Sequence, residues 1–426
     1  MTTAVFIGSL LGAMALGMPI AIALLVCALA LQALQGRFEL TILSQKLIEG
    51  ADSYPLLAIP FFVLAGELMN AGGMSRRIVD AAMACVGHVR GGLGYVAVLA
   101  ALLMAAMSGS ATADAAVLGA VLLPMMRRAG YDLPSSAGLI STAACIAPVL
   151  PPSVALVIFG VIANVSIGKL FMAGIVPALL MGAALLGTWA WMVRTQRLAP
   201  GARSTGAERW QAIRRAGWSL LMPLGVVVGG MKAGLFTATE AAVVACAYAW
   251  LVGSALHREL PWRAIYPILV SAVRTTAVVV FLIAAALASA WLITVSEVPQ
   301  QIGRVLAPLH GDPRLLMLVI MVMVFVIGTA LDFAPTLMIL TPVLMPIVRS
   351  AGIDPVYFGI LFIMNNAIGL VTPPVGIVLN VVSGVGGVSL RDVVRGSWPF
   401  IVAQCGVMLL LVAFPAIVLV PLRWLT

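Results

Sequence analysis

Apolar residues along this chain form runs near or above the length of a membrane-spanning helix, and short polar stretches separate these runs from one end to the other. A helix needs about 20 apolar residues to cross a bilayer, and backbone exposed to lipid must satisfy its own hydrogen bonds. The strict alternation that barrel strands require is absent. The pattern therefore predicts an all-α polytopic membrane protein.

Most of these runs are expected to be simple spans or interfacial helices. Residues 3–34 predict one long or proline-broken helix, retained rather than cleaved as a signal peptide, with Gly17 and Pro19 at the break. Residues 72–80 predict an amphipathic connection, and residues 262–275 an interfacial helix with Arg274 at its end. Further spans are expected at 54–70, 169–193, 216–231, 239–256, 276–295 and 397–421.

Four other runs are interrupted. Residues 92–130 turn at SGSATAD and residues 314–349 turn at GTALDFAPT, which predicts two re-entrant hairpins whose tips are covered by protein or face a water cavity. Residues 135–163 are interrupted by PVLPPS, and residues 356–383 by LVTPP. Proline removes a backbone donor and clashes with the preceding turn, so both helices are expected to open at these sites.

The interrupted runs occur in the same order twice, at one constant offset in the numbering. The offset from Pro124 to Pro346 is the same as the offset from Pro177 to Pro399. It also relates Ala129-Gly130, Asp132, Pro151-Pro152 and Gly174 to Ala351-Gly352, Asp354, Pro373-Pro374 and Gly396, without a gap. We interpret residues 1–193 and 216–426 as two inverted repeats produced by an internal duplication, joined by a linker at 194–215.

Composition and charge agree with a membrane location. Hydrophobic residues make up 62% of the chain and charged residues 9%, whereas a soluble domain carries about a quarter charged residues. The linker is rich in arginine, which by the positive-inside rule predicts that it is cytoplasmic, with both chain termini periplasmic. The net charge of +9 has no accompanying basic face or aromatic pattern, so nucleic-acid binding is not expected. The arginines of this region are Arg194, Arg197, Arg203, Arg209, Arg214 and Arg215.

The residue types of enzymes and metal centres lack their usual spacing. The motifs HExxH and GxSxG are absent, which argues against an intramembrane enzyme. The histidines His88, His257 and His310 have no apparent partners, so they predict no metal site. The cysteines lack CxxC spacing and are expected to be buried small hydrophobic residues; they are Cys27, Cys85, Cys145, Cys246 and Cys405.

Two interrupted helices at matching positions are the best sequence indication of a transporter's binding site. The freed carbonyl groups can bind Na⁺, and the new helix N-termini attract an anion. The first tip adds the hydroxyl groups of Ser108 and Ser110, and Gly109 allows a tight turn. The second tip offers Gly328, Thr329 and Asp332. Kinks that serve packing alone would explain one break, but two breaks that each face a polar tip favour a site.

Acidic residues within apolar surroundings are functional candidates because they are costly there. Asp332 at the second tip is the expected residue for ion coupling. Asp114 is equally compatible with ion coupling and with capping the second arm of its hairpin. Glu240 follows Thr237 at the spacing of a capping box, which predicts a structural role.

Asparagines near the second break have two interpretations. Asn365 and Asn366 could contact substrate or form hydrogen bonds with neighbouring helices, while the structural role is favoured for Asn380. A channel is a competing class, because duplicated chains with re-entrant tips also form channels. Saturable, sodium-driven uptake would distinguish a carrier from a channel.

Four motifs together resemble a known family. GLFTATEAA at 234–242, the SGSATADAA tip and the breaks PVLPPS and AIGLVTPPVG are similar to the large membrane subunit of TRAP transporters, the DctM type, over essentially the whole chain. The resemblance implies an elevator-type transporter of the bacterial inner membrane that imports organic anions with sodium. It also implies two separate partners, a four-helix membrane subunit of DctQ type and a periplasmic binding protein of DctP type. An ion-coupled anion carrier without a binding protein is the alternative.

The resemblance also assigns site residues by motif, with Na⁺ as the coupling ion and no other cofactor. Ala147 stands where a glycine is common in the family, and the second tip has GTALD in place of SGS. Substrate contacts are expected from Gly109, Ser153, Asn365, Asn366 and Pro374, while the binding protein selects much of the substrate. The implied sodium ligands are Ser108, Ser110, Ala147, Val149 and Pro151 in the first repeat, and Gly328, Thr329, Asp332, Gly369 and Thr372 in the second.

Overall fold

The structure is a computed structural model that describes residues 2–36, 39–194, 198, 200, 201, 203–306 and 311–425. Arg197 and His310, which are named above, lie outside these residues. All regular elements in the described chain are helices. Seven helical segments are long and apolar enough to cross a membrane: Tyr54–Ala71, Ile167–Val193, Ala238–Leu256, Trp262–Val295, Pro313–Ala330, Phe333–Ser350 and Leu390–Ala413. The predicted class, an all-α polytopic membrane protein, is therefore confirmed.

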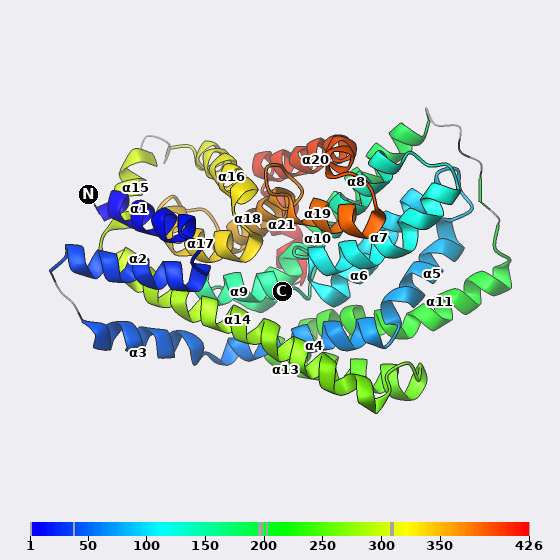
Figure 1. Ribbon diagram of the computed structural model, residues 1–426, viewed down its shortest axis with the longest axis horizontal. Coiled ribbons are helices and arrows are strands. Elements are labelled where there is room, and N and C mark those ends of the chain that lie inside the picture. The colour runs from blue at the N-terminus through cyan, green and yellow to red at the C-terminus, as the bar shows by residue number, and fades with distance from the viewer. Residues whose placement is uncertain are drawn as a thin grey trace.

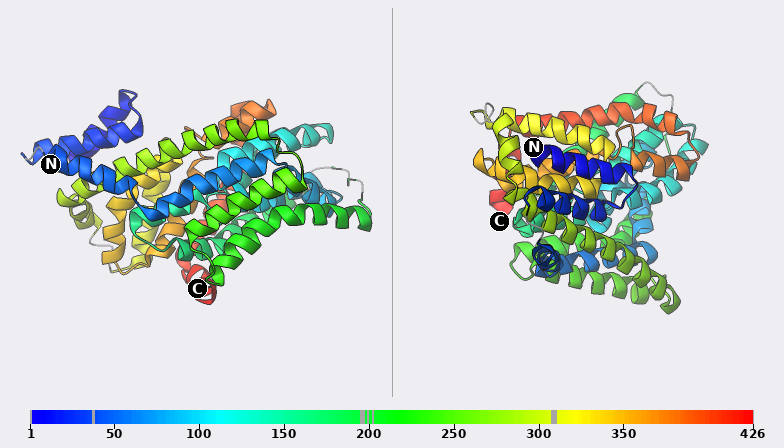
Figure 2. Two further views of the ribbon diagram at one scale, coloured as in Figure 1. Left: turned by 90° about the horizontal axis from the view of Figure 1, so that it is seen from below. Right: turned by 60° about the vertical axis from the view of Figure 1, so that its left-hand side comes forward.

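The helices form two groups that lie along opposite sides of the molecule (Figure 1). One group contains α3 (Leu40–Ala51), α4 (Ala58–Ala71), α11 (Gly206–Leu220), α13 (Ala238–Leu251) and α14 (Trp262–Val295). In the left view of Figure 2, where the molecule is seen from below, α13 and α14 lie in front of the other group of helices. The hairpins and interrupted helices make up most of the other group, and α4 and α14 contact both groups.

Both hairpins lie at the predicted positions. The first consists of α6 (Gly92–Ser108) and α7 (Ala111–Arg128), with Gly109 between them at a positive φ of 59°. The second consists of α16 (Pro313–Ala330) and α17 (Phe333–Ser350). Helices α7 and α17 have the same length, 18 residues, and their starts are separated by the offset that relates the proline landmarks. The helix bounds thus follow the repeat found in the sequence, and the grouping into inverted repeats stays a prediction.

The two interrupted helices also form where proline predicts them. In the first, α8 (Leu133–Ala144) and α9 (Val154–Ala163) are separated by residues 145–153. In the second, α18 (Pro355–Gly369) and α19 (Ile377–Gly386) are separated by residues 370–376. Asp132 and Asp354 cap the starts of α8 and α18 with their carboxylates, and a proline occupies the first turn of each helix. Local chemistry therefore defines where the first half of each interrupted helix begins.

Glycines allow the helices behind the first break to approach closely. Gly138 of α8 lies against Gly396 of α20 (Leu390–Ala413), so that a Cβ atom at Gly396 would lie 1.9 Å from the carbonyl oxygen of Pro134. Gly174 of α10 (Ile167–Val193) lies against the carbonyl oxygen of Val149 in the break itself. Small residues are typical of such close helix contacts in membranes. Helices α10 and α20 thus hold the first interrupted helix in place.

The opening run is a proline-broken hairpin rather than one long helix. Helix α1 (Thr2–Ala15) and helix α2 (Ile20–Leu34) are separated at Gly17, whose φ is 77°, and they pack against each other. Each arm has fewer residues than the roughly 20 needed to cross the bilayer. The predicted break is confirmed, and its consequence is that the chain reverses direction there.

Three predicted boundaries are wrong. The interfacial helix at 262–275 and the span at 276–295 are one continuous helix, α14, because no glycine or proline occurs between Ser271 and Val280. The linker at 194–215 is not a loop throughout, since α11 begins at Gly206. The final span begins at Leu390 and is divided by Pro415 into α20 and α21 (Ala416–Leu425).

Two capping boxes explain where helices near the linker begin. Thr205 and Glu208 form such a box at the start of α11, and Thr237 and Glu240 form one at the start of α13. The structural role predicted for Glu240 is therefore confirmed. The expectation that the cysteines are buried holds for Cys27 and Cys145, whereas Cys246 and Cys405 are half-buried and Cys85 of α5 (Met74–Val86) is exposed.

The predicted orientation can be tested at the start of α11. Ala207 is exposed and takes no part in the capping box, so Ala207→Cys in a chain without its native cysteines should fold normally. Because the positive-inside rule predicts a cytoplasmic position, an impermeant maleimide should label this cysteine only after the cells are permeabilised. Labelling from outside intact cells would reverse the orientation.

Candidate ion and substrate site

A cleft of about 470 Å³ brings the two hairpin tips and the two breaks together. Ser108, Gly109 and Ser110 line it from the first tip, and Asp332 lines it from the second. Pro148 and Leu370 contribute from the two breaks. The facing wall comes from α4 and α14, whose polar contributions are Glu67, Asn70 and Thr275. Segments from both halves of the chain therefore form one site, with each group of helices supplying one wall.

Four helices begin at this cleft. Ala111, Val154, Phe333 and Ile377 are the first residues of α7, α9, α17 and α19, and all four line it. The N-terminus of a helix carries unsatisfied N–H groups and a partial positive charge, which together favour anions. The paired hairpins and breaks thus direct four helix N-termini toward one cleft, which the carboxylates of Glu67 and Asp332 also line.

The first tip packs directly onto the first break. A Cβ atom at Gly109 would lie 3.2 Å from the Cα of Ser153 and 3.3 Å from the carbonyl oxygen of Pro152. With its positive φ as well, this position requires glycine. The adjacent Ser110 caps α7, since its Oγ accepts a hydrogen bond from the N–H of Ala113. Gly109 therefore sets the distance between the tip and the break.

Asp114 does not cap α7, because Ser110 occupies that position. Its Oδ1 instead accepts a hydrogen bond of 2.6 Å from the hydroxyl of Ser108. The side chain is 1% exposed, and Oδ2 has no hydrogen-bond partner among the described residues. A buried carboxylate oxygen without a partner is costly, so this oxygen is available to a cation beside Ser108 and Ser110. The structure therefore excludes the capping role of Asp114, and its role in ion coupling stays a prediction.

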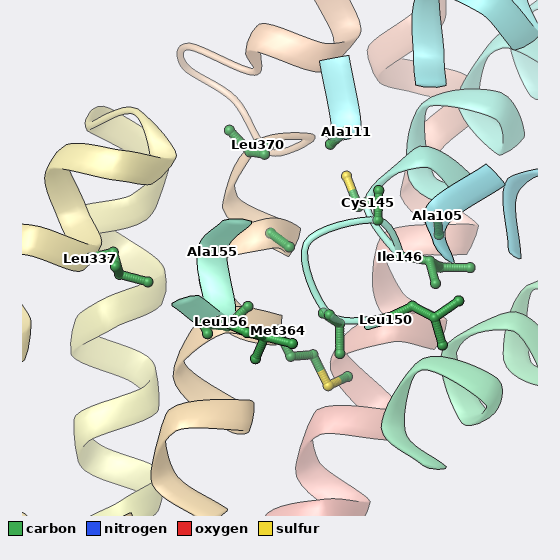
Figure 3. Packing of buried hydrophobic residues seen from close by; sticks show 14 of the residues in the cluster. Ala105, Ala111, Cys145, Ile146, Leu150, Ala155, Leu156, Leu337, Met364 and Leu370 are labelled. Carbon is green, nitrogen blue, oxygen red and sulfur yellow. The ribbon is translucent and has the colours of Figure 1, made fainter. Parts of the chain in front are cut away.

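The first break supplies free backbone oxygens. Within the described chain, the carbonyl groups of Ala147, Val149 and Pro151 accept no backbone hydrogen bond. Residues Cys145 to Ser153 are all buried, and Figure 3 shows Cys145, Ile146 and Leu150 on this connection among buried apolar side chains of neighbouring helices. The carbonyl of Val149 faces Gly174 of α10. Freed carbonyls in a dry surrounding are the type of ligand that broken helices offer to Na⁺.

The second tip has a different arrangement. Asp332 caps α17 by accepting a hydrogen bond from the N–H of Phe333, and the residue is exposed at the cleft. The hydroxyl of Thr329 donates to the carbonyl of Val326, and that of Thr372 donates to the carbonyl of Ile368. A hydroxyl that donates its proton within the chain keeps oxygen lone pairs for a cation. Oxygen atoms from the tip and from the end of α18 are therefore still available here.

Glycine again joins the second tip to the second break. A Cβ atom at Gly369 would lie 2.8 Å from the carbonyl oxygen of Gly328, so the end of α18 contacts the end of α16 backbone to backbone. Unlike the carbonyls of the first break, that of Gly369 accepts a hydrogen bond from the N–H of Thr372. Both contacts between a tip and a break thus depend on a glycine. The two breaks differ in which backbone carbonyl oxygens accept no hydrogen bond.

The asparagines lie behind the second tip rather than in the cleft. The amide nitrogen of Asn365 donates to the carbonyl of Met321, and that of Asn366 donates to the carbonyl of Phe333. Both side chains are buried, and both Oδ1 atoms lack a partner in the described structure. These contacts fit the structural interpretation of the pair. Asn380 likewise donates to the carbonyl of Val375, as expected of a structural residue.

Two further predicted substrate residues do not line the cleft. Ser153 is buried, donates to the carbonyl of Pro148 and accepts from the N–H of Ala155, so its hydroxyl stabilises the break and the start of α9. Pro374 is exposed in the second break. Among the predicted substrate contacts, Gly109 is the one that lies at the cleft surface.

The opposite wall contains polar residues that the sequence did not assign to a site. Glu67 of α4 accepts a hydrogen bond of 3.2 Å from the hydroxyl of Ser271 on α14. Asn70 lies one turn further along α4, and Thr275 lies one turn after Ser271. Glu67 is the one acidic residue in the otherwise apolar span at 54–70, and this isolation was the sequence signal that could have marked it as a site residue. Its position opposite the tips depends on how α4 packs and has no local signature.

Two oxygen-rich tips, two opened helices and four helix N-termini around one cleft define a membrane transport protein. Hydroxyl, carboxylate and carbonyl oxygens are the ligands that hard cations prefer, and the helix N-termini are suited to an anion. The family assignment agrees with this class. A family model described as "Tripartite ATP-independent periplasmic transporter, DctM component" matches residues 7–417. The chain belongs to this family.

Individual relatives support the same assignment. The chain is 49% identical to the 2,3-diketo-L-gulonate TRAP transporter large permease protein of Escherichia coli strain K12, over 100% of both sequences. It is 38% identical to the isethionate TRAP transporter permease protein DctMQ of Oleidesulfovibrio alaskensis, over 94% of this chain and 63% of that protein. The predicted resemblance is thus confirmed. These relatives are transporter permeases, which places the chain with transporters rather than enzymes.

The fold has a counterpart among solved structures. The crystal structure of the Alcanivorax borkumensis YdaH transporter superimposes with a TM-score of 0.62 at 15% identity, covering 89% of each chain. At that identity the likeness concerns the fold alone. The arrangement of helices is therefore shared with a transporter whose sequence is distant.

Proposed function

We propose that this chain is the sodium-coupled permease of a three-component importer for small organic anions, chiefly carboxylates, in the bacterial inner membrane. The observation that carries the proposal is the cleft in which four helix N-termini meet the oxygen-rich hairpin tips. In this proposal, Na⁺ and the anion bind together, because each neutralises charge that the other would leave in a buried site.

The sodium ligands follow from the oxygens that are free. At the first tip, Ser108, Ser110 and the unpartnered Oδ2 of Asp114 lie near one another, with the carbonyls of Ala147, Val149 and Pro151 as further donors. At the second tip, the proposed ligands are Asp332 with the backbone and hydroxyl oxygens of Gly328, Thr329, Gly369 and Thr372. One sodium site in each repeat would couple transport to at least two ions.

The substrate class is supported by the chemistry of the relatives' substrates. 2,3-Diketo-L-gulonate is a carboxylate and isethionate is a sulfonate, so the two named relatives transport organic anions. A monoanionic head group suits a cleft that receives positive potential from four helix N-termini. Glu67 and Asn70 on the opposite wall are placed to contact the polar remainder of the molecule.

The partners are a small membrane subunit of DctQ type and a periplasmic binding protein of DctP type. The family is tripartite by description, and the isethionate relative is a longer protein named for both membrane components. We further propose an elevator movement, in which the hairpins and interrupted helices move against α4, α13 and α14. A channel is the disfavoured alternative, since each tip packs closely against its break, at Gly109 in the first half and at Gly369 in the second.

Dependence on the binding protein tests this function. Proteoliposomes that contain the chain and its small subunit should take up labelled 2,3-diketo-L-gulonate or a related carboxylate only when the cognate binding protein is present. Uptake should saturate with the loaded binding protein, as expected of a carrier. An equal rate without the binding protein would favour the simpler anion carrier, and a rate that never saturates would favour a channel.

A further inference from the structure

A second cleft, of about 830 Å³, lies outside the transport site and is lined by arginines. It is formed where α5 contacts α11 and by the end of η3 (Val252–Leu256), the segment that continues α13. Arg76 and Arg77 line it from α5, and Arg214 and Arg215 from α11. Its acidic residues are Asp80, Glu208 and Glu259. The proposed transport reaction uses none of these residues.

Two of the three acidic residues already have partners. Glu259 forms an ion pair of 2.7 Å with Arg77, which also donates to the carbonyl of Gly73. Glu208 accepts hydrogen bonds from Thr205 in the capping box of α11, and these bonds lower the pKa of its carboxyl group. Asp80 lines the cleft together with Arg76, Arg214 and Arg215, none of which forms an ion pair within the described chain. Hydrogen bonds from Thr205 do not cancel the charge of Glu208, so the lining has four arginines against three carboxylates, an excess of one positive charge.

The turn between α4 and α5 packs closely against the charged residues at one side of the cleft. A Cβ atom at Gly73, whose φ is 71°, would collide with the carboxylate of Glu259, so the turn between α4 and α5 fits closely against that side chain. His257 is in polar contact with the carbonyl of Gly72. Burial and the nearby Arg77 lower the pKa of His257, which favours its neutral imidazole.

One edge of the cleft is apolar and open. Trp218 is 48% exposed and Leu256 is 51% exposed, and both line the cleft beside the arginines. Trp210 and Ile213 of α11, and Leu221 directly after it, add exposed apolar surface. Trp210, Arg214 and Trp218 follow one another at four-residue spacing and so share one face of α11, a mixture of tryptophan and arginine that is typical of a helix at the membrane surface. The site therefore combines a positive pocket with a path for acyl chains.

We propose that this cleft binds the head group of an anionic phospholipid, such as phosphatidylglycerol. Arginine forms bidentate hydrogen bonds with phosphate oxygens, and basic pockets between helices on the cytoplasmic side of membrane proteins bind anionic head groups. The phosphate contacts Arg214, Arg215 and Arg76, while the acyl chains pass over Trp218 and Leu256. Bound lipid fixes α11 against α5 at the end of α4, the helix that supplies Glu67 to the transport cleft.

Native mass spectrometry of the delipidated full chain, titrated with phosphatidylglycerol or phosphatidylethanolamine, tests the proposal. The chain should bind phosphatidylglycerol more tightly than phosphatidylethanolamine. Each basic residue near a membrane surface contributes about a fivefold change in affinity, so the double variant Arg214→Gln/Arg215→Gln should weaken phosphatidylglycerol binding roughly thirtyfold. The charge-preserving pair Arg214→Lys/Arg215→Lys should retain most of the affinity, which separates loss of charge from loss of folding.

Matched controls and competitors make the result decisive. Arg128 and Arg391 are exposed arginines outside this cleft, so Arg128→Gln/Arg391→Gln should leave binding unchanged. The proposal is overturned if the glutamine pair at 214 and 215 binds phosphatidylglycerol as wild type does. If the glutamine variant also no longer binds the small membrane subunit, the cleft is a protein-docking surface instead of a lipid site. The proposal is equally overturned if inorganic phosphate binds as tightly as the lipid, which would indicate a free-anion site.

Discussion

Asp332→Asn is expected to raise the Na⁺ concentration that half-saturates uptake by roughly 5- to 150-fold, in a chain that still folds. The expectation follows from losing one charged ligand of the bound cation, an effect on the order of 1–3 kcal/mol for a polar interaction with a charged group. Asparagine caps a helix about as well as aspartate, so α17 keeps its N-cap. The substitution therefore removes the charge without removing the structural role that Asp332 also has.

Ser108→Ala should act in the same direction through the other tip. It removes a hydroxyl ligand and leaves the buried Oδ1 of Asp114 without its 2.6 Å hydrogen bond. A change at either tip should also lower the steepness of the Na⁺ response, because each tip is proposed to build one site. The measurement is the initial uptake rate against Na⁺ concentration at matched membrane expression.

The control for both variants is Ser136→Ala. This serine is buried, lies outside the transport cleft and donates its hydroxyl to the carbonyl of Asp132 at the start of α8. It should leave the midpoint and slope of the Na⁺ response unchanged. If the tip variants behave like this control, the two breaks are packing kinks and the assignment of sodium sites is wrong.

Gly396→Ala should prevent normal accumulation of the folded chain. A Cβ atom there would lie 1.9 Å from the oxygen and 2.2 Å from the carbon of the Pro134 carbonyl, so α20 and α8 would have to separate. Overpacking a well-packed interior costs about 1–3 kcal/mol and sometimes more, and backbone atoms cannot rotate away as a side chain can. We expect a large loss of thermal stability, read by fluorescence-detected size exclusion after heating.

Gly406→Ala provides a control on the same helix. No atom lies within 4 Å of a Cβ placed at Gly406, so this substitution adds a methyl group to open space. It should match wild-type stability or exceed it slightly, since alanine favours helix more than glycine does. Equal stability of the two variants would show that α8 and α20 do not pack as described.

The sequence located the hairpins and interrupted helices because local chemistry determines them. Proline pairs open a helix wherever they occur, and the SGS tip combines a permissive glycine with a capping serine. The constant offset between the two halves added a second, independent indication at each position. Elements defined by their own residues were therefore predictable to within a few positions.

The boundaries that failed depend on weaker signals. Arg274 suggested the end of an interfacial helix, yet a charged residue does not interrupt hydrogen bonding along α14. The start of α11 was signalled by Thr205 and Glu208, a capping box hidden among the arginines of the linker. Asp114 and Ser110 compete for one capping position, and sequence alone does not decide which side chain reaches the N–H groups.

The composition of the cleft could not be predicted because it arises from tertiary packing. Glu67, Asn70 and Thr275 meet the hairpin tips only through the way α4 and α14 pack against the other group of helices. The meeting of four helix N-termini likewise requires both hairpins and both interrupted helices to be folded. Sequence identifies each polar residue singly, whereas their convergence is a property of the fold.

The most direct test of the account is the ion that drives transport. Proteoliposomes with both membrane subunits and the loaded binding protein are given an inward gradient of either Na⁺ or K⁺ at equal ionic strength and membrane potential. The account predicts accumulation of the carboxylate against its gradient with Na⁺ and none with K⁺. Equal accumulation with K⁺ would contradict it.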